Sequence, residues 1–262
     1  MAYQRQVHFE TKALAWQDVV LVEAAPSWRD SYEASGPRLL LPGAGPMGCE
    51  LDGRRFVCDS FNGVWLTPAQ RYRLRQPHAR QRSTVLLVHD DQLGQLRPRR
   101  APLGLSVHTQ LSLWRSALRR GEAPRLALEE ALFGMLQSAL GADADAAADQ
   151  RLHGAVERAR EYLAAQPQGS DSLAQIAAVA CCSPFHLARA FRRYTGKSLH
   201  GYRTQLRMVL ALQRIEQGQD DLAALAGDLG YSSHSHFSAA FARHFGCPPR
   251  QLRTNLTARK QR

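Results

Sequence analysis

The sequence predicts an α+β protein of two domains, with a β-rich N-terminal half and an all-helical C-terminal half. Three observations predict it. Short apolar runs separated by Gly, Pro, Asn and Asp fill the first hundred residues, apolar residues at helical spacing follow them, and one helical pattern occurs twice near the C-terminus. The length of 262 residues is enough for two ordinary domains.

The N-terminal half carries five short runs typical of strands, over 19–24, 38–42, 54–59, 63–68 and 83–90. Asp52 and Gly53 lie between apolar segments and indicate a hairpin with a two-residue turn. Many short strands with frequent turns favour a small sandwich or barrel.

Two amphipathic helices are predicted next. Their apolar stripes are Val107, Leu111, Trp114 and Leu118 in the first, and Leu128, Leu132, Met135 and Leu136 in the second. We expect both helices to pack on the N-terminal domain, and they also offer a dimer interface. The small, acidic segment 141–150 is the predicted linker, so the predicted domains are residues 1–140 and 151–262.

Charge is distributed unevenly along the chain. Residues 1–150 hold 18 Lys and Arg against 16 Asp and Glu, a net charge of +2, whereas residues 151–262 hold 16 against 7, a net charge of +9. A basic C-terminal region favours a polyanionic partner, nucleic acid first and anionic lipid second. The sequence has neither a long apolar run nor the apolar core of a secretory signal, so the expected compartment is the cytoplasm.

The pattern that occurs twice is CCSPFHLARAFRRYTG at 181–196 and YSSHSHFSAAFARHFG at 231–246. Each copy follows a short apolar helix pattern, so each indicates helix, tight turn, helix, and a longer helix over 199–218 joins them. Helix-turn-helix motifs place their second helix in a DNA major groove. A spacer of about 18 residues is roughly 27 Å long, close to the roughly 34 Å between successive major grooves. A helical repeat bundle without nucleic acid is the alternative.

With these residues, the region 151–253 resembles the AraC-type (AraC/XylS) bacterial transcription regulators. The resemblance is carried by SLAQIAAVACCSPFHLARAFRRYTGKSLHGYRTQLR and LAALAGDLGYSSHSHFSAAFARHFGCPPRQLR. It implies that the second helix of each motif contacts bases and phosphates. The matching DNA-binding positions are Phe185, His186, Ala188, Arg189, Arg192, Arg193, His234, Ser235, Ser238, Ala239 and Arg243.

The second motif departs from the family pattern, since many relatives carry Arg or Lys where Ala239 and Ala242 stand. We therefore expect the first motif to supply most direct base readout, with Arg189 contacting a guanine, and the second to position the protein on phosphates. The family also implies an N-terminal cupin-like β-barrel that senses a small molecule, dimerises, or both. Residues 1–140 fit that layout more loosely.

The resemblance implies a sequence-specific regulator, without enzyme activity or cofactor, whose main partner is double-stranded promoter DNA. RNA polymerase and, through the helices over 106–140, a second copy of the chain are further expected partners. The effector is unknown. The alternative is a small-molecule-binding barrel whose basic helical half docks a protein or membrane partner.

Metal sites are not expected. His234 and His236 are two residues apart and do not share a helix face, and His89-Asp90-Asp91 is a second weak motif. A cupin metal centre needs several histidines, and the stretch 59–78 offers only His78, so a metal-free barrel is expected.

Two clusters leave alternatives open. Cys181 and Cys182 either pack in the turn of the first motif or form a thiol switch beside the DNA-reading helix. The rings of Trp16, Trp28, Trp65 and Tyr72 either form barrel core or line a ligand pocket.

Overall fold

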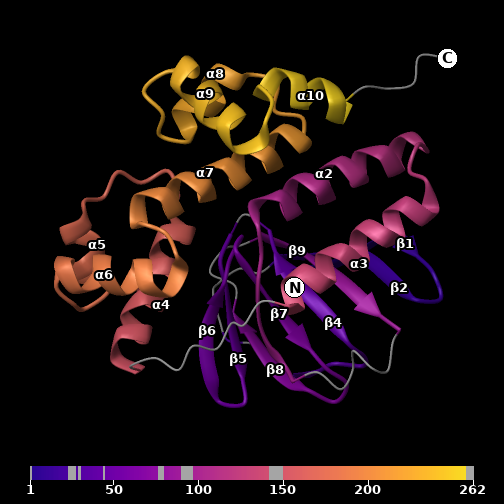
Figure 1. Ribbon diagram of the computed structural model, residues 1–262, viewed down its shortest axis with the longest axis horizontal. Coiled ribbons are helices and arrows are strands. Elements are labelled where there is room, and N and C mark those ends of the chain that lie inside the picture. The colour runs from indigo at the N-terminus through magenta and orange to yellow at the C-terminus, as the bar shows by residue number, and fades with distance from the viewer. Residues whose placement is uncertain are drawn as a thin grey trace. The chain divides into compact units, whose positions relative to one another are not determined.

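The computed structural model describes residues 2–22, 28, 31–43, 45–75, 80–89, 97–141 and 150–257. Its contacts divide the chain into two compact modules, seen in Figure 1. The β-rich module comprises Met1–Gly104 and Pro124–Ala146, and the helical module comprises Leu105–Ala123 and Ala147–Arg262. The predicted α+β fold class, with strands first and helices after them, is confirmed.

The β-rich module is built from two antiparallel sheets. Its strands are β1 (Ala2–Glu10), β2 (Leu14–Val22), β3 (Tyr32–Glu33), β4 (Arg38–Pro42), β5 (Met47–Leu51), β6 (Arg54–Cys58), β7 (Asn62–Leu66), β8 (Arg71–Arg75), β9 (Arg80–Val88) and β10 (Arg99–Pro102). One sheet has the order β1-β2-β9-β4-β7-β10 and the other the order β3-β8-β5-β6. The five predicted runs correspond to β2, β4, β6, β7 and β9.

The predicted hairpin joins β5 to β6. Asp52 and Gly53 have positive φ angles of 49° and 75°, and Leu51 pairs with Arg54 across the turn. Two positive φ angles in a two-residue loop match the right-handed twist of the strands. Both sheets contribute to one apolar core, formed by Val19, Leu21, Leu40, Met47, Cys49, Leu51, Cys58, Val64, Leu66, Leu74 and Val85. Two sheets around one core is the arrangement expected of a cupin-like barrel.

Helix α3 (Arg125–Gly141) belongs to the β-rich module. It buries all four residues of the predicted stripe and also Ala139. Its Glu129 accepts a hydrogen bond from Thr11 Oγ1 at 2.7 Å, and Arg99 donates to the carbonyl of Leu140. Contacts from a strand end and from β10 therefore hold both ends of α3 on the sheet.

Helix α2 (Leu105–Arg120) belongs instead to the helical module, where it contacts α7 (Leu199–Glu216) and α10 (Pro249–Thr257). Arg115 Nη1 lies 3.5 Å from Glu216 Oε1, and these side chains are only 6% and 4% exposed. Ser116 Oγ donates to the carbonyl of Leu256 at 2.7 Å. Of the two helices predicted to pack on the N-terminal domain, α3 does so, whereas α2 packs in the helical module. The linker 141–150 lies mostly outside the described residues, and the predicted domain boundaries stay a prediction.

The remaining helices all lie in the helical module: α4 (Gln150–Ala165), α5 (Leu173–Val179), α6 (Pro184–Thr195), α8 (Leu222–Asp228) and α9 (His234–Phe245). Among the described residues, none of the helices has both the length and the apolar character needed to cross a membrane.

Candidate nucleic-acid interface

The helical module contains the same motif twice. In the first motif α5 has seven residues and α6 twelve, and in the second α8 has seven and α9 twelve. The long helix α7 joins them, and Figure 1 shows α6 followed by α7 as α9 is followed by α10. The predicted pair of helix-turn-helix motifs with a spacer helix is confirmed.

The second helix of each motif begins and ends in the same way. Ser183 and Ser233 each accept a hydrogen bond from the backbone N–H three residues on, at 3.3 and 3.1 Å. Gly196 and Gly246 end the helices with φ angles of 70° and 73°. A serine at the start pairs an otherwise free N–H, and a glycine at the end adopts the left-handed conformation without a Cβ clash. These local residues set the bounds of α6 and α9.

Apolar stripes fix which face of each helix is turned inward. The buried residues are Leu187, Ala190 and Phe191 in α6, and Phe237, Ala240 and Phe241 in α9. These positions are related by the same fifty-residue shift that relates the caps. Because the stripes match, the two outward faces consist of equivalent positions in both motifs.

Most of the predicted DNA-binding residues are exposed. The exposed ones are Phe185, His186, Arg189, Arg192, Arg193, His234, Ser235, Ala239 and Arg243, while Ala188 and Ser238 are half-buried. Phe185 is 71% exposed, an unusual position for a large apolar ring and one that suits contact with a base or a thymine methyl group.

The outward arginines are available for a polyanion. In the described part of the chain, no carboxylate forms an ion pair with Arg189, Arg192, Arg193 or Arg243. The polar side chains of Ser183 and His186 at the start of the same helix lie 2.7 Å apart, measured from Oγ to Nδ1. The first motif therefore presents three uncompensated guanidinium groups on α6, and the second presents one on α9.

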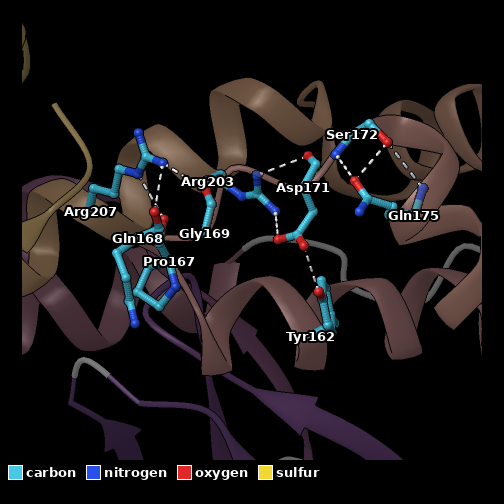
Figure 2. Close-up of polar contacts among 9 residues, drawn as sticks. All are labelled: Tyr162, Pro167, Gln168, Gly169, Asp171, Ser172, Gln175, Arg203 and Arg207. Atoms are coloured by element: carbon cyan, nitrogen blue, oxygen red, sulfur yellow. Dashed lines mark hydrogen bonds and ion pairs between the residues drawn. The ribbon is translucent and has the colours of Figure 1, made fainter. Parts of the chain in front are cut away.

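An arginine clamp braces the start of each motif. In the first, Arg203 donates to the carbonyl and to Oδ2 of Asp171, both at 3.1 Å (Figure 2). In the second, Arg253 donates to the carbonyl of Asp220 at 2.5 Å and lies 3.8 Å from its Oδ1. Tyr162 also donates to Asp171 Oδ1 at 2.9 Å, and this bond, with help from Arg203, holds the pKa of Asp171 below its ordinary value. The two arginines are fifty residues apart, which is the shift that relates the two motifs, but the sequence alone does not identify their partners.

Comparison with known proteins shows what the part of this module that carries the two motifs is similar to. Residues 176–255 match a helix-turn-helix domain family. The transcriptional regulator YidL of Escherichia coli strain K12 is 35% identical over 100 residues, which cover 38% of this chain and 34% of YidL. An AraC-like transcription regulator of Streptomyces lividans is 34% identical over 102 residues, which cover 39% of this chain and 34% of that protein. The part of the chain that carries both motifs, from α4 to α10, is therefore called the AraC-type domain below, after the relatives that it resembles.

A solved structure is also similar to the AraC-type domain. The C-terminal domain of AraT, a response regulator from Geobacillus stearothermophilus, is 28% identical with a TM-score of 0.39, and the match covers 43% of this chain and 93% of that one. The chain spans about a third of the length of the two curated relatives, so their sequence similarity is confined to about the length of the AraC-type domain.

The turn of the first motif in the AraC-type domain contains the two adjacent cysteines. Cys181 lies two residues after the end of α5 and has a positive φ of 54°. Gly230 lies two residues after the end of α8, at the equivalent point of the second motif, and has a φ of 74°. Burial raises the pKa of the Cys182 thiol, which keeps that thiol protonated at neutral pH and lowers its reactivity. This favours the packing role for Cys182 over a thiol switch.

The other sequence candidates belong to the sequence range of the β-rich module. Trp16 and Trp65 are fully buried, whereas Trp28 lies beneath the guanidinium of Arg55 at 4.9 Å and Tyr72 stacks on Tyr32. Core packing therefore accounts for Trp16 and Trp65, and the half-buried Tyr72 also packs against the core. His78, Asp90 and Asp91 lie outside the described residues. Within the described residues, no three His, Cys, Asp or Glu side chains gather as a metal site.

Proposed function

We propose that this protein is a sequence-specific regulator of transcription that binds double-stranded DNA. The observation that carries the proposal is the duplicated motif of the AraC-type domain, whose two outward helix faces occupy equivalent positions on either side of α7. Each of α6 and α9 has the size and exposure to enter a major groove. Both helices belong to one polypeptide, so one chain reads two successive grooves.

In this proposal α6 and α9 have different roles. Arg189 lies on the outward face of α6 and is our candidate for a bidentate contact to guanine O6 and N7. Arg192 and Arg193 lie one turn further along and suit phosphate contacts. Helix α9 presents Ala239 and Ala242 at the positions equivalent to Arg189 and Arg192, so its role is to anchor the protein on the backbone rather than to select bases.

The β-rich module supplies regulation in this proposal. Its two-sheet core suits a small-molecule sensor, and α2 and α3 are the candidates for a contact with a second copy of the chain. RNA polymerase is the further partner that a transcription regulator acts on. Such a protein acts in the cytoplasm, where bacterial DNA lies.

The test is selection of duplexes from a random pool by the full chain, followed by binding measurements at two salt concentrations. We expect one preferred sequence with two conserved blocks, about one helical turn apart, and a steep loss of affinity with salt. The specific duplex should bind at least about a thousandfold more tightly than a scrambled one. Weak binding that is equal on all duplexes would reject the proposal and favour a basic surface that docks another partner.

A further inference from the structure

Arg207 on α7 holds the loop that leads into the first motif. Its Nε donates to the carbonyl of Pro167 at 2.7 Å, and its Nη2 donates to the carbonyls of Gly169 at 2.8 Å and Gln168 at 3.3 Å. Figure 2 shows the guanidinium directed at these three carbonyls, beside the Arg203 clamp. The loop connects α4 to α5, so this contact fixes the first motif on α7.

The same guanidinium lies against the turn of the second motif. Its carbon is 5.7 Å from the centre of the Tyr231 ring, between α8 and α9. Gly230, one residue earlier, packs so closely that an added Cβ would lie 2.8 Å from the carbonyl oxygen of Gln168 and 3.2 Å from Arg207 Nη2. The loop of the first motif, α7 and the turn of the second motif therefore meet at one point, which we name the joint (Pro167–Gly169, Arg207 and Gly230–Tyr231).

The chemistry of the joint requires an arginine. Burial lowers the pKa of Arg207, yet a guanidinium stays charged in proteins. In the described part of the chain its partners are carbonyl dipoles and a ring face, with no carboxylate among them. Three charge-assisted bonds offset its desolvation. The planar guanidinium of Arg207 donates to several carbonyls while its face packs on the Tyr231 ring. A lysine ammonium cannot do both.

We propose that Arg207 is a positioning residue that sets the orientation of α9 relative to α6. Both motifs also pack on α7, through contacts of α6 and of α9 with that helix. The joint adds a direct attachment between the loop of the first motif and the turn of the second. This inference rests on the proposed function, because a fixed orientation matters only if both helices engage one duplex.

A fixed orientation has a measurable consequence for binding. Once α6 is in its groove, α9 binds as an intramolecular event, with an effective concentration set by how often it points at the next groove. Loosening the joint lowers that concentration without altering the contacts that either helix makes alone. Loss of Arg207 should therefore weaken binding to two grooves and spare binding to one.

The experiment compares three variants of the full chain with the wild type. Arg207→Gln removes the charge and the fork, and Arg207→Lys keeps the charge. Arg214→Gln is the matched control, because Arg214 lies on the same helix, and its exposed bridge to Asp228 at 2.7 Å stays within the second motif and its spacer. The probes are the duplex that the wild type selects from a random pool and two versions with one or the other block scrambled.

We expect Arg207→Gln to bind the intact duplex about tenfold or more weakly, and each half-scrambled duplex within about twofold of the wild type. Arg207→Lys should show most of the same selective loss, and Arg214→Gln should stay within about twofold on all three probes. Insertion of one or two base pairs between the blocks should cost the Gln variant less than it costs the wild type. Equal losses on all three probes, or none, would overturn the proposal.

A second measurement tests the joint without DNA. The amides of Gly169 and Tyr231 are hydrogen-bonded to Gln166 and Ala226, so their exchange with deuterium reports on the loop and on the turn. Arg207→Gln and Arg207→Lys should speed exchange over both 166–170 and 229–233, with α6 and α9 unchanged. Faster exchange in the loop alone would overturn the proposal that Arg207 couples the two motifs. If the wild type shows no preferred duplex, the proposed function fails, while this measurement still decides whether Arg207 couples the motifs.

Discussion

The two motifs of the AraC-type domain share their framework and differ on their surface. Both second helices have a serine at the start, a left-handed glycine at the end and an apolar stripe at equivalent positions. The outward faces differ, with three arginines on α6 and one on α9. Caps and stripes specify the fold of a motif, and this leaves the outward face free to change. One framework therefore carries two different outward faces, which agrees with the proposed division into base reading by α6 and anchoring by α9.

The motifs also differ in how they are braced. The Asp171 side chain is 22% exposed in the first clamp, whereas the Asp220 side chain is 87% exposed in the second. Tyr162, nine residues before Asp171, adds a bond to the first clamp. Ala211 stands nine residues before Asp220 and has no side-chain group that could form this bond in the second clamp. The first motif, which we propose as the base reader, thus has the more extensively bonded clamp, and this suits contacts that need accurate placement.

The largest expected effect compares Arg189 on α6 with Arg243 on α9. Arg189→Ala should weaken binding to the preferred duplex by about 1–3 kcal/mol and relax the requirement at one base pair. Arg243→Ala should weaken binding to every duplex similarly and reduce the salt slope by about 1. Titrations against single-base variants of the preferred duplex check both. A loss from Arg189→Ala that is the same on every variant would make Arg189 a phosphate contact.

Substitutions at the equivalent turn positions, Gly230 and Cys181, should change the free energy of unfolding in opposite directions. Gly230→Ala places a Cβ at a φ of 74° and against the Gln168 carbonyl, so it should lower the free energy of unfolding by about 2 kcal/mol. Cys181→Gly relieves a side chain held at a φ of 54°, so it should raise that free energy by about 0.5 kcal/mol. Urea unfolding of both variants measures the difference. Destabilisation by Cys181→Gly would show that the thiol packs usefully in the turn.

A smaller difference is expected between the clamps. Arg203→Ala breaks two bonds to Asp171 in a largely buried setting and should cost about 1.5–2 kcal/mol of unfolding free energy. Arg253→Ala breaks a clamp whose carboxylate is exposed and should cost less than about 1 kcal/mol. Thermal unfolding of the two variants gives the comparison. Equal losses would show that exposure of the carboxylate does not decide the strength of the clamp.

The smallest effect is a dependence on pH in the first clamp. The pKa of Asp171 is lowered in the fold, chiefly by the Tyr162 hydrogen bond, so its ionised form stabilises the protein at pH values above the unfolded pKa of about 3.9. That contribution is lost as the pH falls through the lower, folded pKa. The stability difference between the wild type and Asp171→Asn should shrink below about pH 4. Tyr162→Phe should bring the folded pKa closer to the unfolded one, so the shrinkage should be smaller and should be complete at a higher pH. A shrinkage of unchanged size would contradict the role of this bond.

The β-rich module illustrates how far sequence patterns reach. The run 38–42 was predicted with the bounds that β4 has, and Asp52-Gly53 was predicted as the hairpin, because apolar runs and turn residues act over a few positions. β8 was not among the five predicted runs. Its Tyr72 and Leu74 alternate with arginines, and this alternation was the available signal for a strand.

The sequence by itself determined the two helix-turn-helix motifs, their caps and their outward faces, because each depends on residues within one or two helical turns of one another. It also placed the excess positive charge in the C-terminal region. Only the tertiary structure decided that α2 packs in the helical module while α3 packs on the sheet, since an amphipathic stripe specifies a buried face but not its partner. The clamps and the joint also became visible only in the tertiary structure, because Arg203 and Arg207 bond to backbone carbonyl groups more than thirty residues away. Since every residue type has a backbone carbonyl, the sequence does not show which one an arginine will contact.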